Sequence, residues 1–170
     1  MNKTVRRALR FTARILGKLL LTGEDDGLTG IWFDRALPTQ GTSADHPVLE
    51  KTNRWLDAYF CGENPPMEIP LVLEGTAFQK QVWQLLLKIP YGQTKTYGAL
   101  AREMAFLTGK KRMSAQAVGQ AVGRNPISIL IPCHRVVGAQ GQLTGYAGGM
   151  DRKIWLLRWE GRQIEKNIVL

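Results

Sequence analysis

The chain has 170 residues, 44% of them apolar, so it can bury a core as one domain or as two small ones. Its 23 Lys and Arg against 14 Asp and Glu give a net charge of +9. This charge favours a protein with a polyanionic partner, first nucleic acid and second an anionic membrane, over a basic enzyme without such a partner. Two cysteines exclude a disulfide framework, and with two histidines in no zinc-finger spacing they argue against a metal. This cysteine usage is typical of a reducing cytoplasm.

The first part of the chain is predicted to mix strands and one helix. Arg14 and Lys18 interrupt the basic, apolar start, so it is expected to be part of the fold or a basic arm, not a signal peptide or membrane span. Apolar runs on both sides of Asp25-Asp26-Gly27 predict a hairpin over 18–34. Helical spacing predicts a helix over 47–60, and the proline-rich stretch 63–75 predicts a linker with a short strand. We therefore expect two domains, 1–75 and 76–170.

The second part is predicted to be more helical. Thr76 and Gln79 form a capping-box pattern before a helix that ends at Pro90, and a second helix is expected within 96–106. A basic loop, 108–113, leads to a helix over 114–123. The apolar run 127–131 predicts a strand, 138–149 is a glycine-rich loop, and Asp151 is expected to cap a last helix that Gly161 stops.

Cys133 is the candidate nucleophile. A lone cysteine is most commonly a small buried apolar residue, but His134 and Arg135 follow this one directly. Imidazole and cationic neighbours lower the pKa of a thiol and favour the reactive thiolate. Adjacent side chains of an extended chain point to opposite sides, so a water is expected to bridge Cys133 and His134.

Three segments carry a resemblance to a known family. NPISILIPCHRVVG (125–138), GQLTGYAGG (141–149) and RKIWLLRWEG (152–161) resemble the O6-alkylguanine-DNA alkyltransferases, and the similarity covers essentially all of 76–161 and extends more weakly before it. The resemblance implies an α/β protein. It would have an N-terminal ribonuclease-H-like α/β domain and a mostly helical C-terminal domain with a winged helix-turn-helix-like DNA-binding motif.

The resemblance also implies roles in catalysis. Cys133 matches the alkyl acceptor, His134 the base that activates the thiol through a water, and Glu160 the acid that orients this histidine. Asn125 matches the residue that braces the segment before the nucleophile, and Tyr97 the tyrosine that assists the departing guanine. Taken alone, these last three would more commonly be a surface acid, a turn residue and a core aromatic.

The lesion pocket and the DNA-binding surface follow from the same resemblance. Helix 114–123 is rich in small residues, which suits either tight helix packing or close approach to a minor groove. Gln116 stands where many relatives carry an arginine that replaces the flipped base, and the longer loop 106–113 offers Lys110, Lys111 or Arg112 instead. The expected substrate-binding residues are Tyr146, Ala147 (a serine in some relatives), Gly148 and Val136. The expected DNA contacts are Ala115, Gln116, Ala117, Gly119, Gln120, Gly123, Arg124, Arg135, Lys111 and Arg112.

The implied function is direct repair. The protein would flip O6-alkylguanine, and O4-alkylthymine as a second substrate, out of double-stranded DNA and transfer the alkyl group to Cys133 in a single turnover. It would need no cofactor or metal and would act as a monomer, with cooperative binding on DNA left open, in the cytoplasm or, in a eukaryote, the nucleus. Alternatives are a non-catalytic or slow lesion sensor, a helix-turn-helix transcription factor, and a cysteine hydrolase or redox protein.

Overall fold

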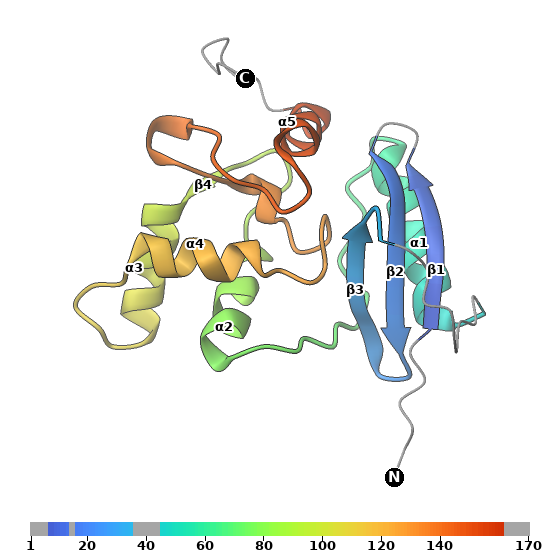
Figure 1. The fold of residues 1–170 in the computed structure, drawn as a ribbon, viewed down its shortest axis with the longest axis horizontal. Coiled ribbons are helices and arrows are strands. Elements are labelled where there is room, and N and C mark those ends of the chain that lie inside the picture. The colour runs from blue at the N-terminus through green and yellow to red at the C-terminus, as the bar shows by residue number, and fades with distance from the viewer. Residues whose placement is uncertain (1–6, 14–15, 36–44, 162–170) are drawn as a thin grey trace. The chain divides into compact units, whose positions relative to one another are not determined.

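The structure is a computed structural model that describes residues 7–13, 16–35 and 45–161. The chain divides into two compact units, 1–74 with 126–128 and 75–125 with 129–170 (Figure 1). The first six residues of the basic N-terminal stretch, and Arg14 within it, lie outside the described residues. None of the helices in the described ranges is long and apolar enough to cross a membrane.

The described residues of the first unit form a three-stranded antiparallel sheet with one helix against it. Strands β1 (Arg7–Ala13), β2 (Gly17–Glu24) and β3 (Gly27–Phe33) lie in the order β1-β2-β3, and α1 (Pro47–Phe60) packs along the sheet (Figure 1). The predicted hairpin is confirmed, because β2 and β3 pair around the turn that ends at Gly27, whose φ is 153°. The predicted helix 47–60 is confirmed as well.

Two later segments of the chain return to β3. Leu28 bridges Leu71, and this single bridge is all that forms of the short strand predicted within 63–75. Ile31 bridges Ile127 through two backbone bonds, from its N–H to the Pro126 carbonyl (3.0 Å) and from the Ser128 N–H to its own carbonyl (3.2 Å). The segment 126–128 therefore belongs to the first unit, although the sequence division at residue 75 places it in the second.

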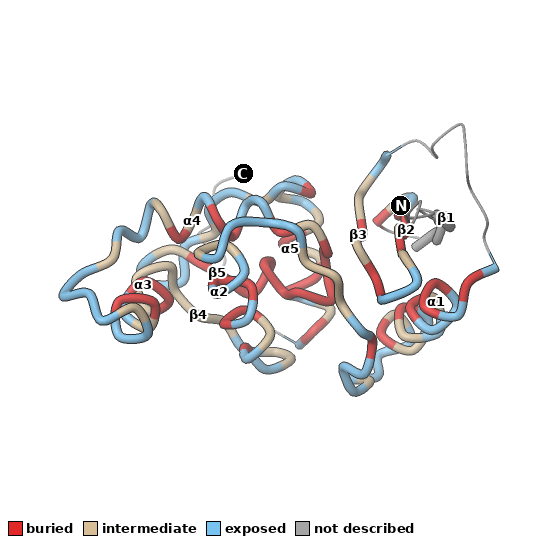
Figure 2. Tube along the Cα trace, turned by 90° about the horizontal axis from the view of Figure 1, so that it is seen from below, coloured by how far each residue is buried: buried red, intermediate tan, exposed pale blue. Residues whose placement is uncertain are grey.

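The prediction of a strand over 127–131 is wrong. Only Ile127 makes a bridge, and the chain then turns at Ile129, where φ is 72°. The run is apolar because it is buried: residues 127–137 form an unbroken buried stretch (Figure 2). Burial alone made the run resemble a strand, since a buried turn and a buried strand have the same composition.

The described part of the second unit contains four α-helices. They are α2 (Ala77–Leu86), α3 (Tyr97–Leu107), α4 (Ala115–Gly123) and α5 (Met150–Trp159). The capping box of Thr76 with Gln79 and the Ser114 cap of α4 are confirmed. Both α2 and α3 pack on α4, and the Trp83 indole donates to the Ala121 carbonyl at 2.9 Å.

Two short strands pair within this unit, and its last helix begins earlier than the sequence predicts. Strands β4 (Lys95–Thr96) and β5 (Val136–Val137) pair in parallel and so join the start of α3 to the chain just after Cys133. Asp151 does not cap α5: the N-cap is Gly149, with φ 91° and no side-chain bond, and Asp151 lies in the first turn. A carboxylate there still interacts favourably with the helix dipole, so the residue type suits both positions.

Candidate active site around Cys133

Cys133 lies in a tight turn, not at the end of a strand. It opens the 3-10 helix η1 (Cys133–Arg135) and is 5% exposed. Asn125, just after α4, donates from Nδ2 to the sulfur at 3.1 Å and to the Ile131 carbonyl at 2.8 Å. One amide therefore holds both the candidate nucleophile and the buried segment before it.

His134 and Glu160 form a buried pair. The Nε2 of His134 lies 2.7 Å from a Glu160 oxygen, and both side chains are 0% exposed. The Gly92 N–H donates to the other Glu160 oxygen at 3.3 Å. The Nδ1 of His134 is buried and has no hydrogen-bond partner among the described protein atoms. The histidine is thus oriented at one nitrogen and has its other nitrogen available inside the site.

Arg135 was expected to contact DNA, and the geometry does not fit that expectation. Its side chain is buried, and its guanidinium donates to both Glu160 oxygens at 2.8 and 2.9 Å and to the Ile89 carbonyl at 2.7 Å. A bidentate pair of this kind is strong and directional. Arg135 is a positioning residue that fixes the Glu160 carboxylate against His134.

The ionisation of the site follows from burial and these contacts. Burial raises the pKa of the Cys133 thiol, while the Asn125 hydrogen bond and the charge of Lys153 act in the opposite direction. This is opposite to the lowered pKa expected from the sequence. Burial lowers the pKa of His134, against the Glu160 contact that raises it, so the imidazole is neutral at pH 7. Although burial acts to raise it, the pKa of Glu160 is lowered by His134 and Arg135, and it is a carboxylate.

Lys153 is a site residue that the sequence reading missed. It lies on α5, is 0% exposed, and donates from Nζ to the carbonyls of Val136 (2.6 Å), Thr144 (3.0 Å) and Gly145 (3.3 Å). Burial lowers its pKa to about 8, and Cys133 raises it. Its sequence context, a lysine in the first turn of an amphipathic helix, resembles a surface position, so no residue pattern indicated it.

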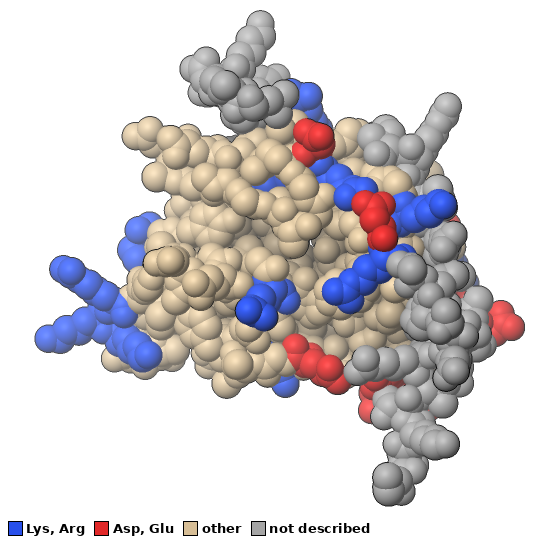
Figure 3. Space-filling model, in the orientation of Figure 1, with Lys and Arg blue, Asp and Glu red and all other residues tan. Residues whose placement is uncertain are grey.

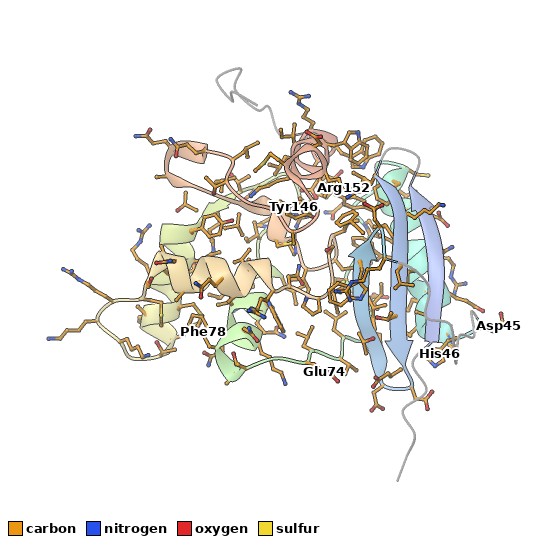
Figure 4. The ribbon with its side chains drawn as sticks, in the orientation of Figure 1. Asp45, His46, Glu74, Phe78, Tyr146 and Arg152 are labelled. Atoms are coloured by element: carbon orange, nitrogen blue, oxygen red, sulfur yellow. The ribbon has the colours of Figure 1, made fainter. Side chains whose placement is uncertain are left out.

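The glycine-rich loop makes hydrogen bonds with residues around this site. The Tyr97 hydroxyl donates to the Thr144 carbonyl at 3.5 Å, and Arg152 donates to the Gly148 carbonyl at 3.0 Å. Burial raises the pKa of Tyr146 well above its ordinary value, and the charge of Cys133 acts in the same direction. Tyr146 and Arg152 come from the loop and from α5 respectively (Figure 4). Val136 and Gly148 are buried and Ala147 is exposed.

The predicted DNA contacts on α4 and its preceding loop are mostly exposed. Gly119 is half-buried, and a side chain there would meet the Tyr97 ring at 3.6 Å, which ties the middle of α4 to the site. In the described ranges no group of three or more His, Cys, Asp or Glu side chains could hold a metal ion. The exposed members of the expected surface are Ala115, Gln116, Gln120, Gly123, Arg124, Lys111 and Arg112, and Ala117 is half-buried.

Together, fold and site define a protein with a buried cysteine nucleophile, an acid–histidine pair and a helical domain that presents a small-residue helix. Two family models match this chain: the 6-O-methylguanine DNA methyltransferase ribonuclease-like domain over residues 10–73 and the DNA binding domain of the same family over 77–162. The chain belongs to the 6-O-methylguanine DNA methyltransferase family. It thus combines a ribonuclease-like domain with a DNA-binding domain in a mixed α/β protein.

Relatives and solved structures agree with this assignment. The chain is 43% identical to a methylated-DNA–protein-cysteine methyltransferase of Methanosarcina acetivorans over 86% of this chain and 93% of the relative. It is 42% identical to one of Mycobacterium leprae over 91% and 93%. Mycobacterium tuberculosis OGT, solved in complex with DNA, is similar with a TM-score of 0.76 and 39% identity over 91% of both chains.

Proposed function

We propose that this protein repairs double-stranded DNA by moving the alkyl group of O6-alkylguanine to its own Cys133. The observation that carries the proposal is a buried thiol held by the Asn125 amide at 3.1 Å and followed directly in the chain by His134, which pairs with Glu160 at 2.7 Å. A nucleophile, a base and a group that orients the base are the parts that covalent catalysis needs.

The proposed reaction is a single displacement. His134, neutral at rest, takes the Cys133 proton through a water at Nδ1, and the Glu160 carboxylate, which Arg135 holds in place, stabilises the imidazolium that results. The thiolate attacks the alkyl carbon, a sulfur–carbon bond forms, and the carbon–O6 bond breaks. Tyr97 donates a hydrogen bond to the leaving guanine anion, which then takes up a proton from water, and the imidazolium gives its proton back to water. The thioether on Cys133 is permanent, so each molecule acts once.

The DNA side of the proposal uses α3 and α4 as a winged helix-turn-helix-like pair. The described chain has no Asp or Glu between Glu103 and Asp151, which leaves α4 and its flanking loops without acidic repulsion of phosphates. Close approach of α4 to the minor groove would let the target nucleotide flip toward Cys133. Its base would lie against Tyr146, Ala147, Gly148 and Val136. O4-alkylthymine is a second expected substrate.

The assembly and setting are part of the same proposal. One chain carries both the nucleophile and the helix, so a monomer is sufficient for repair, without cofactor or metal. A thiol that must stay reduced until it reacts suits a reducing compartment, so the proposed location is the cytoplasm, or the nucleus in a eukaryote. The two domains are proposed to divide near residue 75.

The proposal is tested by mass spectrometry of the protein after incubation with duplex DNA that carries O6-methylguanine labelled on the methyl group. We expect one labelled methyl group on the peptide that contains Cys133, and none on the Cys133→Ala protein. Binding without transfer would instead identify a lesion sensor. Transfer that persists in Cys133→Ala would assign the acceptor to another residue.

A further inference from the structure

The most exposed large apolar side chains of the described residues lie next to a cluster of cations. Phe106 is 86% exposed and Leu107 is 55% exposed, at the end of α3. Lys110, Lys111 and Arg112 follow and are all exposed. We name residues 106–112 the α3–α4 tip. Figure 3 shows basic side chains projecting on the side where Figure 1 places this loop, with no acidic side chain beside them among the residues drawn in that view.

The backbone gives the tip a defined shape. Lys110 donates its N–H to the Ala105 carbonyl at 2.9 Å, and Gly109, at φ 66°, donates to the Phe106 carbonyl at 3.2 Å. This pair of bonds is the Schellman arrangement, which ends a helix and sets the direction of the chain after it. The Thr108 hydroxyl closes the same turn on the Met104 carbonyl at 2.7 Å. The backbone that leads into the three cationic residues is therefore held in a defined conformation.

A role in the fold alone accounts for the cations of the tip but not for its exposed apolar side chains. Cations near the C-terminus of a helix interact favourably with its dipole, which accounts for Lys110 and its neighbours. It does not account for Phe106, because an aromatic ring that is 86% exposed contributes little to the core. Apolar side chains beside cations are a combination that DNA-binding surfaces use: the cations bind phosphates, and the apolar groups contact sugars or wedge between bases.

We propose that the α3–α4 tip is a second DNA-contacting element, with its three cations on the phosphate backbone and Phe106 against the minor groove beside them. This inference rests on the proposed function, since it takes DNA as the partner. It also gives the chain a source of affinity where Gln116 replaces a charged side chain. The positive charge of the tip, without any acid between Glu103 and Asp151, selects DNA over a second copy of this chain, whose net charge is +9.

The test measures the affinity of the intact protein for an undamaged duplex over a series of salt concentrations. In the triple variant Lys110→Ala/Lys111→Ala/Arg112→Ala, the slope of log affinity against log salt should become shallower by about 0.9 for each lost phosphate contact, or about 2 to 3 in all. The control, Lys18→Ala/Lys88→Ala/Arg158→Ala, removes the same charge from other exposed positions and should change the slope by less than about one. Equal thermal midpoints show that both variants fold.

The apolar half of the tip has its own variant. Phe106→Ser should weaken DNA binding by about tenfold with an unchanged salt slope, because an apolar contact releases no counterions, and Phe106→Leu should retain most of the affinity. Equal slopes for wild type and the triple variant would overturn the inference. So would a Phe106→Ser protein that differs only in self-association during sedimentation. If wild-type Cys133 gains no methyl group while the slopes still differ, the proposed chemistry fails and the tip remains a DNA contact.

Discussion

At the scale of single residues, the nucleophile of the site is in its unreactive, uncharged thiol form at rest. Burial raises the pKa of Cys133 and lowers the pKa of His134, so thiol and imidazole are both neutral at pH 7. The Glu160 carboxylate is held between His134 and the Arg135 guanidinium. Moving the thiol proton to His134 would therefore create an imidazolium next to a charge that is already in place, which is the preorganisation that lowers a barrier.

Replacing Glu160 with glutamine tests this pairing. The change removes the charge that stabilises the imidazolium, so we expect the methyl-transfer rate to fall by at least about tenfold. Glu160 raises the pKa of His134, so its loss lowers that pKa further. The imidazole stays neutral to lower pH, and the acid limb of the rate profile should move to lower pH. Single-turnover rates at a series of pH values measure both effects.

The matched control for this variant is Glu103→Gln. Glu103 is also paired with a cation, Lys95 at 2.6 Å, but its side chain is 41% exposed. Removing this half-exposed charge should leave the transfer rate and its pH profile unchanged. A Glu160→Gln protein that reacts as fast as this control would show that the acid has no part in activating the thiol.

Lys153 provides a second residue-scale prediction. Its ammonium group joins the Val136, Thr144 and Gly145 carbonyls, so Lys153→Met would leave these acceptors unpaired and release the loop over Cys133. We expect the unfolding free energy to fall by about 1 to 3 kcal/mol and methyl transfer to slow. Lys153→Arg should recover part of both the stability and the transfer rate. Chemical denaturation and transfer rates measure these effects. Equal losses in both variants would contradict a role for the positive charge.

At the scale of elements, sequence patterns predicted the parts that depend on local chemistry. The capping box at Thr76, the Ser114 cap and the hairpin before Gly27 all occur, because caps and turns are set by neighbouring residues. The strand over 127–131 failed because burial, not alternation, made that run apolar. Asp151 failed as a cap because Gly149, with φ 91°, begins the helix earlier.

The site could be predicted only as far as its motif extends. His134 and Glu160 are 26 residues apart and meet as the family resemblance implies. Arg135 was assigned to DNA because arginine commonly binds phosphate, whereas its partners, Glu160 and the Ile89 carbonyl, come together only in the folded chain. Lys153 had no signal, because its carbonyl partners lie on three tertiary neighbours that no local pattern brings to it.

The exposed face of α4 gives a prediction about DNA. Gln116 is exposed near the start of the helix, where an arginine would add a charged, longer side chain. We expect Gln116→Arg to repair O6-methylguanine in duplex DNA faster than the wild type, by stabilising the flipped base. Gln120→Arg, about one turn further along the same helix, adds equal charge and should have a smaller effect. An unchanged or slower rate for Gln116→Arg would contradict the prediction.

At the scale of the whole molecule, the segment before the nucleophile is shared between the two units. Asn125 belongs to the second unit, and residues 126–128 belong to the first. Asn125 braces Cys133 within the second unit, and the three residues after it pair with β3 of the first. Ile31 and Ile127 bridge each other and are both 0% exposed. A disturbance in the core of the first unit can therefore reach the nucleophile along a few residues of chain.

Ile31→Ala tests this connection against Leu56→Ala. Both side chains are 0% exposed in the first unit, and each truncation should cost about 2 to 5 kcal/mol of unfolding free energy. Only Ile31 bridges the segment before Cys133, and a small displacement of a reacting group costs up to about 100-fold in rate. Transfer by the folded protein, measured well below its thermal midpoint, should therefore slow at least about tenfold in Ile31→Ala and stay normal in Leu56→Ala. Equal rates would mean that Asn125 alone positions the nucleophile.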